Sequence, residues 1–164
     1  MIKLIVLDVD GTLTNGTIYY DEHGNQFRGF NVHDGLMMVA WKKLGGLSAI
    51  ITGKVSSQVE RRGKELGVDF IRQGVRNKAI VLEDIVEMSG LSWKEVAVIG
   101  DDFNDLPLFK LAGRTFAPAN ASPYILQQAH YRLKRRGGEG AVAEMIEILI
   151  KEQRRWEEFL ALWQ

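Results

Sequence analysis

Strand-like and helix-like segments alternate along almost the whole of this chain. Runs rich in β-branched and apolar residues predict buried strands at residues 4–7, 47–51, 70–71 and 96–99, with weaker candidates at 114–117 and 131–133. Segments with helical spacing of apolar residues lie between them, at about 34–44, 55–66, 77–88 and 106–111. This alternation is typical of α/β domains in which helices cover both faces of a parallel sheet.

Two segments depart from this alternation. Two β-prone runs around a polar, Gly-containing turn predict a small hairpin at about residues 16–31. From about 141 to 163 the apolar residues predict one long helix with an apolar face that continues almost to the end of the sequence. A lone hairpin is marginal in water, and an exposed apolar face usually marks an interaction site. We therefore expect both segments to pack on the parent domain or on another subunit.

Length and charge limit the broad class of protein. With 164 residues and a formal net charge of zero, the chain is expected to form one domain, residues 1–164, without a field that recruits nucleic acid. The absence of cysteine excludes disulfides and thiolate metal sites. The apolar N-terminal run is too short for a signal peptide, and no other stretch approaches a membrane span. We expect a cytoplasmic protein that contacts neither membrane nor nucleic acid.

Two carboxylates stand at the end of the first predicted strand, in the motif Asp8-Val9-Asp10-Gly11-Thr12. In open α/β sheets, ligands bind at this end of the strands. Two acids side by side are costly unless positive charge lies between them, and Mg²⁺ with a substrate phosphate would supply it. Gly11 allows a sharp turn, and the Thr12 hydroxyl is expected to hydrogen-bond within that turn.

Other predicted strand ends and helix starts carry matching groups. Thr52 and Gly53 follow the second strand and offer a hydroxyl and an unhindered N–H to a phosphate oxygen. Lys78 opens a helix and can meet phosphate as a point charge. Three further acids, Asp101, Asp102 and Asp105, follow the fourth strand. Carboxylates, Lys, phosphate and Mg²⁺ together would balance charge.

Each of these elements also has an ordinary structural explanation. A Thr-Gly pair is commonly only a turn, Lys78 is commonly a solvated helix residue, and Asp105 would serve as a helix cap. The adjacent acids Asp101 and Asp102 are harder to explain in this way, because neighbouring carboxylates repel. The ordered occurrence of all these elements at predicted strand ends and helix starts favours a functional site.

These four motifs, in this order, resemble those of the haloacid dehalogenase superfamily of phosphotransferases. The resemblance implies a Rossmann-like sheet without a cap domain, because the segments where caps are inserted are too short here. It also implies that Asp8 attacks phosphorus and that Asp10 protonates the leaving oxygen and then deprotonates water. Mg²⁺ would bind Asp8, the backbone carbonyl of Asp10, and Asp101.

The same resemblance assigns roles to the other motif residues. Thr52, the Gly53 N–H and Lys78 would bind the phosphoryl oxygens, with Lys78 counted among the catalytic groups. Asp105 would orient Lys78, and Asp102 would support the site without touching the phosphate.

More closely, the chain is similar to the 3-deoxy-D-manno-octulosonate 8-phosphate phosphatase family, a capless branch of that superfamily. The similarity rests on residues 30–35, on Gln73-Gly74 before Asn77-Lys78, and on residues 137–142. It implies a Mg²⁺-dependent phosphatase of lipopolysaccharide precursor synthesis, assembled as a homotetramer in which hairpins from neighbouring subunits close each active site, with the C-terminal helix as a further contact. One departure is Lys54, a candidate substrate-binding residue, where that family is expected to have Arg, whose fork recognises carboxylates.

Three alternatives stay open. Lys54 leaves room for another sugar acid, such as a nine-carbon sialic-acid-type 9-phosphate. A phospho-receiver or regulatory module would use similar residue types, although its acceptor Asp should follow a middle strand of the sequence. A structural partner of a larger synthase would leave the acids and Lys78 without a function, at an unexplained cost.

Overall fold

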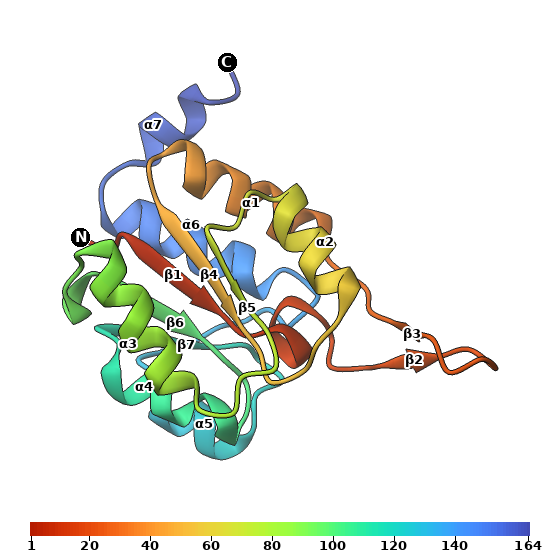
Figure 1. Ribbon diagram of the computed structural model, residues 1–164. Coiled ribbons are helices and arrows are strands. Elements are labelled where there is room, and N and C mark those ends of the chain that lie inside the picture. Colours follow the sequence, from red (N-terminus) through yellow and green to blue (C-terminus); the bar gives the residue numbers. More distant parts are fainter.

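A six-stranded parallel sheet forms the centre of the protein (Figure 1). The computed structural model describes all residues, 1–164. The strands run in the order β5-β4-β1-β6-β7-β8, and every neighbouring pair is parallel. Their bounds are β1 (Leu4–Leu7), β4 (Leu47–Ile51), β5 (Phe70–Arg72), β6 (Val96–Ile99), β7 (Arg114–Ala117) and β8 (Tyr131–Arg132). The predicted α/β class is confirmed, and all six predicted strands form.

Helices cover both faces of this sheet (Figure 1). One apolar cluster involves α1 (Val32–Lys43), α2 (Ser57–Glu65) and α6 (Ala141–Glu152), and the other α3 (Lys78–Ser89), α4 (Leu106–Leu111) and α5 (Pro123–Gln128). The side chains of β1 divide between them by alternation: Ile5 and Leu7 join the first, Leu4 and Val6 the second. Burial of β1 on both faces explains its continuous apolar run.

Two helix starts differ from the expectation. Helix α1 begins at Val32 instead of at about residue 34, because the Asn31 side chain caps it and accepts hydrogen bonds from the N–H groups of His33 and Asp34. The Asp34 carboxylate is buried and accepts from the Ala143 N–H at the start of α6. Helix α5 was not predicted, although Ser122 at its N-cap and proline in its first turn are typical start signals.

The predicted hairpin is present as β2 (Tyr19–Tyr20) paired antiparallel with β3 (Gln26–Phe27). It projects away from the sheet (Figure 1). Its aromatic side chains Tyr19, Tyr20 and Phe27 are about half exposed or more. The hairpin thus carries apolar surface that its own chain leaves uncovered.

The prediction of one C-terminal helix over residues 141–163 is wrong. Helix α6 ends at Glu152, and α7 (Trp156–Ala161) follows a turn in which Arg154 has a φ of 57°. The turn brings Phe159 back onto the apolar cluster that contains α6, where it is 8% exposed. The turn thus lets α7 bury an aromatic side chain on this cluster.

Three short helical turns, η1 (Val9–Leu13), η2 (Trp93–Glu95) and η3 (Phe103–Asp105), complete the secondary structure. A capping box formed by Ser92 and Glu95 starts η2. None of the helices has both the length and the apolar character needed to cross a membrane.

Candidate active site

The carboxyl ends of β1, β4 and β6 meet at one edge of the sheet, with β1 between the other two. The chain leaves β1 toward β4 and β5 and later returns to β6 on its other side, which makes this edge a topological switch point. A cavity of about 170 Å³ opens here, and no hydrophobic residue lines it. Its lining consists of Asp8, Asp10, Thr52, Gly53, Lys54, Asp101, Asp102 and Asn104. The structure thus brings together seven predicted residues and adds Asn104.

Lys78 lies beneath this cavity between two carboxylates. Its Nζ is 2.7 Å from Oδ1 of Asp8 and 2.7 Å from Oδ1 of Asp105. All three side chains are buried. Burial alone would lower the pKa of Lys78, but the negative charges of Asp8 and Asp105 raise it above its ordinary value. Lys78 is therefore a fixed cation, and the view that it is a solvated helix residue is wrong.

Three carboxylates gather around this point, with oxygens of Asp8, Asp101 and Asp105 within 4.8 Å of one another. Burial, followed by the charge of Asp105, raises the pKa of Asp8 to about 6. Burial, followed by the charges of Asp8 and Asp105, raises the pKa of Asp101 to about 8. Such crowding of acids is relieved when a divalent cation binds. The residues present fit a Mg²⁺ ion.

The three acids do not have equal freedom to bind a metal. Asp105 is already engaged through both oxygens, because Oδ1 meets Lys78 and Oδ2 accepts from the N–H groups of Asp101 and Asp102. Asp8 and Asp101 each keep an oxygen for a cation. Their geometry favours these two as side-chain ligands, and it favours a supporting position for Asp105.

The turn after β1 is packed tightly against Asp101. Gly11 has a φ of +91°, and a Cβ at this position would lie 2.0 Å from Oδ2 of Asp101. Only glycine fits there. The Thr12 hydroxyl donates to Oδ1 of Asp101 at 3.3 Å, so it does not bond within the turn as expected. Thr14 supplies that bond, because its hydroxyl accepts from the Gly11 N–H at 3.2 Å.

Asn120 also holds this turn, and sequence reasoning missed it. Its Nδ2 donates to the Gly11 carbonyl at 2.9 Å, and its Oδ1 accepts from the Gly137 N–H at 2.6 Å. It therefore joins the turn to the loop before α6. A single Asn about 110 residues from its partner has no local sequence signal.

The loop after β4 also lines the cavity, together with the loops after β1 and β6. Thr52 is buried, whereas Gly53 and Lys54 are exposed. A Cβ at Gly53 would make only an ordinary contact of 3.6 Å with the Val75 carbonyl, so packing does not require glycine there. Lys54 forms no ion pair and lines the cavity as a free cation.

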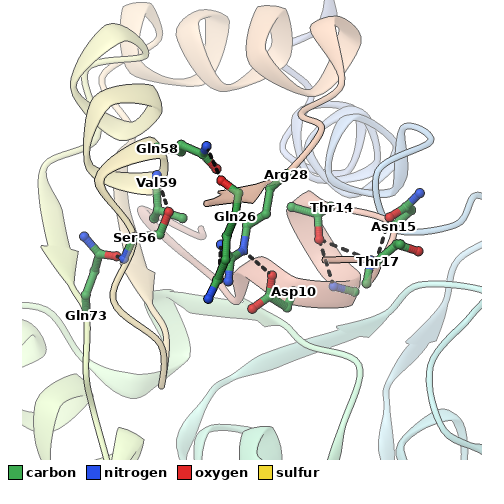
Figure 2. Close-up of polar contacts among 12 residues, drawn as sticks. Asp10, Thr14, Asn15, Thr17, Gln26, Arg28, Ser56, Gln58, Val59 and Gln73 are labelled. Carbon is green, nitrogen blue, oxygen red and sulfur yellow. Dashed lines mark hydrogen bonds and ion pairs between the residues drawn. The ribbon is translucent and has the colours of Figure 1, made fainter. Parts of the chain in front are cut away.

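Asp10 has a partner that was not predicted. Its Oδ1 accepts a hydrogen bond of 2.7 Å from Nε of Arg28, which follows β3 at the base of the hairpin (Figure 2). The hairpin therefore reaches the cavity of its own chain through a charged side chain.

Comparison with known proteins agrees with this geometry. The sequence profile of the haloacid dehalogenase-like hydrolases matches residues 30–146. The 3-deoxy-D-manno-octulosonate 8-phosphate phosphatase KdsC of Escherichia coli (strain K12) is 36% identical over 157 residues, covering 96% of this chain and 84% of that protein.

Solved structures are similar over the same length. The Moraxella catarrhalis 3-deoxy-D-manno-octulosonate 8-phosphate phosphatase, solved with magnesium, phosphate and KDO, has a TM-score of 0.95 and 38% identity, covering 99% of this chain and 94% of that one. The cobalt-bound Haemophilus influenzae enzyme has a TM-score of 0.89 and 34% identity, covering 93% and 89%. The family profile, with relatives this similar over almost the whole chain, shows that the chain belongs to the haloacid dehalogenase-like hydrolases.

Proposed function

We propose that this chain hydrolyses 3-deoxy-D-manno-octulosonate 8-phosphate to 3-deoxy-D-manno-octulosonate and phosphate, with Mg²⁺ as cofactor. The observation that carries the proposal is the buried cation Lys78, which is held between Asp8 and Asp105 and lies near Asp101 at the carboxyl ends of the strands. Relatives with that substrate in their names match almost the whole chain.

In this proposal, Asp8 is the nucleophile. Its carboxylate attacks phosphorus, and the bond from phosphorus to the sugar oxygen breaks, which leaves an aspartyl-phosphate. Asp10 gives its proton to the departing sugar oxygen. Asp10 then takes a proton from the water that attacks the aspartyl-phosphate, and this releases phosphate and restores Asp8. Asp8 and Asp10 both line the cavity, which supports this division of roles.

The remaining groups bind charge. Asp8, the backbone carbonyl of Asp10, and Asp101 would hold Mg²⁺, which supplies positive charge to the phosphoryl oxygens. Thr52, the Gly53 N–H and Lys78 would bind the same oxygens from the other side.

Two acids support these ligands. Asp105 holds Lys78 in place at 2.7 Å, and its other oxygen accepts from the backbone after β6. Asp102 lines the cavity and caps η3 through the Phe103 N–H, so we assign it a supporting role.

We also propose the wider setting that the family resemblance implies: a single domain of residues 1–164, a homotetramer, and a place in lipopolysaccharide precursor synthesis in the cytoplasm. The half-exposed aromatic side chains of the hairpin support an assembly in which the hairpin packs on a neighbouring subunit. Helix α7, which follows the turn after α6, would make the second contact of this assembly.

The experiment is phosphate release from 3-deoxy-D-manno-octulosonate 8-phosphate, with Mg²⁺ and with EDTA, beside a nine-carbon sialic-acid-type 9-phosphate. Lys54 in the cavity wall is the observation that keeps the second substrate in the comparison. We expect metal-dependent release with a clear preference for the eight-carbon substrate. A preference for the nine-carbon substrate would reassign the sugar acid, and release from neither would refute the proposal.

A further inference from the structure

One ion pair connects the hairpin to the cavity. Nε of Arg28 lies 2.7 Å from Oδ1 of Asp10, and the Arg28 side chain is 1% exposed while that of Asp10 is 23% exposed. A buried guanidinium is costly unless it is paired, so the pair with Asp10 fixes both side chains. The second oxygen of Asp10 has no protein partner and remains available on the cavity side.

Arg28 is itself held in place. Its Nη1 donates to Oε1 of Gln26 at 3.3 Å. The Gln26 carbonyl in turn accepts a 2.6 Å hydrogen bond from Nε2 of Gln58 in the first turn of α2 (Figure 2). Helix α2 therefore holds β3, the strand that Arg28 follows.

The other leg of the hairpin is fixed to the loop that carries Asp10. The Thr14 hydroxyl accepts from the Gly16 N–H at 3.2 Å, and Oδ1 of Asn15 accepts from the Thr17 N–H at 2.9 Å (Figure 2). Asp10 thus lies between the two ends of the hairpin. The first end starts in the loop that contains Asp10, and the second end carries Arg28. This closed arrangement limits the positions that the Asp10 carboxylate can take.

We propose that Arg28 is a positioning residue for Asp10. By binding Oδ1, it turns the free oxygen of Asp10 toward the bond that breaks, so that this oxygen carries the transferred proton. The inference rests on the proposed function, in which Asp10 passes a proton to the sugar oxygen and later accepts one from water. Arg28 does not touch the phosphate; it acts through Asp10 alone.

A role in proton transfer can be separated from simple anchoring of the hairpin. An alkyl oxygen needs a proton to leave, whereas a p-nitrophenolate leaves without one. Loss of Asp10 positioning should therefore slow phosphoryl transfer from an alkyl phosphate more than from an aryl phosphate. A general loss of structure would slow both to the same extent.

The experiment compares single-turnover rates of wild type, Arg28→Ala and Arg28→Lys on 3-deoxy-D-manno-octulosonate 8-phosphate and on p-nitrophenyl phosphate. We expect Arg28→Ala to slow the alkyl ester about 10- to 100-fold, a part of the effect of a general acid, and the aryl ester less than threefold. Arg28→Lys keeps one donor and the charge, so we expect it to recover part of the rate.

Asp21→Ala is the matched control, because it loosens the turn of the hairpin, where Asp21 accepts from the N–H groups of His23 and Asn25, and leaves the contacts of Arg28 with Asp10 and Gln26 in place. We expect it to change both rates about equally. Equal losses on both esters for Arg28→Ala, or the same selective loss for Asp21→Ala, would overturn the role of Arg28. If wild type hydrolyses neither ester, the proposed function fails; if it hydrolyses both and Arg28→Ala does not discriminate, only this inference fails.

Discussion

Replacing Lys78 by methionine tests whether this residue holds the buried acids together. Methionine has a similar length but no charge, so the change leaves Asp8 and Asp105 buried without their shared cation. Removing one partner of a buried ion pair usually costs about 3–5 kcal/mol. Since both partners here are acids, the folded variant can reduce this cost by taking up protons.

The free-energy cost of this proton uptake sets the size of the expected loss of stability. Relative to an ionised aspartate in the unfolded chain, a protonated one costs about 4 kcal/mol at pH 7 and about 1.5 kcal/mol at pH 5. Asp8 adds about 1 kcal/mol at pH 7, because its pKa of about 6 with Lys78 present leaves it mostly ionised there, and it adds little at pH 5. We therefore expect Lys78→Met to lower the free energy of unfolding by about 5 kcal/mol at pH 7 and by clearly less at pH 5.

The assay is urea unfolding in EDTA at both pH values, followed by circular dichroism. The double variant Lys78→Met with Asp105→Asn is the matched control, because it removes one of the two unpaired acids. We expect it to regain most of the lost stability at pH 7 while remaining inactive. An unfolding midpoint equal to that of wild type at pH 7, or no recovery in the double variant, would refute this reasoning.

Three further predictions concern single residues. Asp10→Asn should slow turnover at least 100-fold while phosphate still binds, as calorimetry would show; unchanged turnover would remove Asp10 from its role. Gly11→Ala should lower both stability and activity, because its Cβ would meet Asp101 at 2.0 Å, and wild-type unfolding and turnover would contradict the tight packing. Asp34→Asn tests a pH effect. Burial raises the pKa of Asp34 from 3.8 to about 6, so the folded state binds this proton more tightly than the unfolded chain does. The protein therefore loses about 3 kcal/mol of stability as the pH rises from the lower of these two pKa values to above the higher one. Between pH 5 and pH 7.5, wild type should lose about 1–2 kcal/mol more in urea unfolding than the variant, and equal losses would contradict the shift.

The strands and the grouping of the candidate site residues could be predicted because their signals are local. A strand buried on both faces must be apolar throughout, and polar groups at its end stand out, as Asp8 and Asp101 do. Because parallel strands place their carboxyl ends at the same edge of the sheet, residues that directly follow different strands lie close together in space.

Other features depend on contacts between distant parts of the chain. Arg28 is exposed or buried according to where the hairpin lies, and nothing in residues 16–31 specifies that position. The break between α6 and α7 occurs at Arg154 without glycine or proline, while the apolar spacing continues across it. The partner of Asp34 lies in α6, over 100 residues away.

The most direct test of the central claim is phosphate release from 3-deoxy-D-manno-octulosonate 8-phosphate by wild type and by Asp8→Asn, with saturating Mg²⁺. The account predicts metal-dependent turnover by wild type and none by the variant, because the amide cannot form an aspartyl-phosphate. A folded Asp8→Asn variant that turns over near the wild-type rate would contradict it.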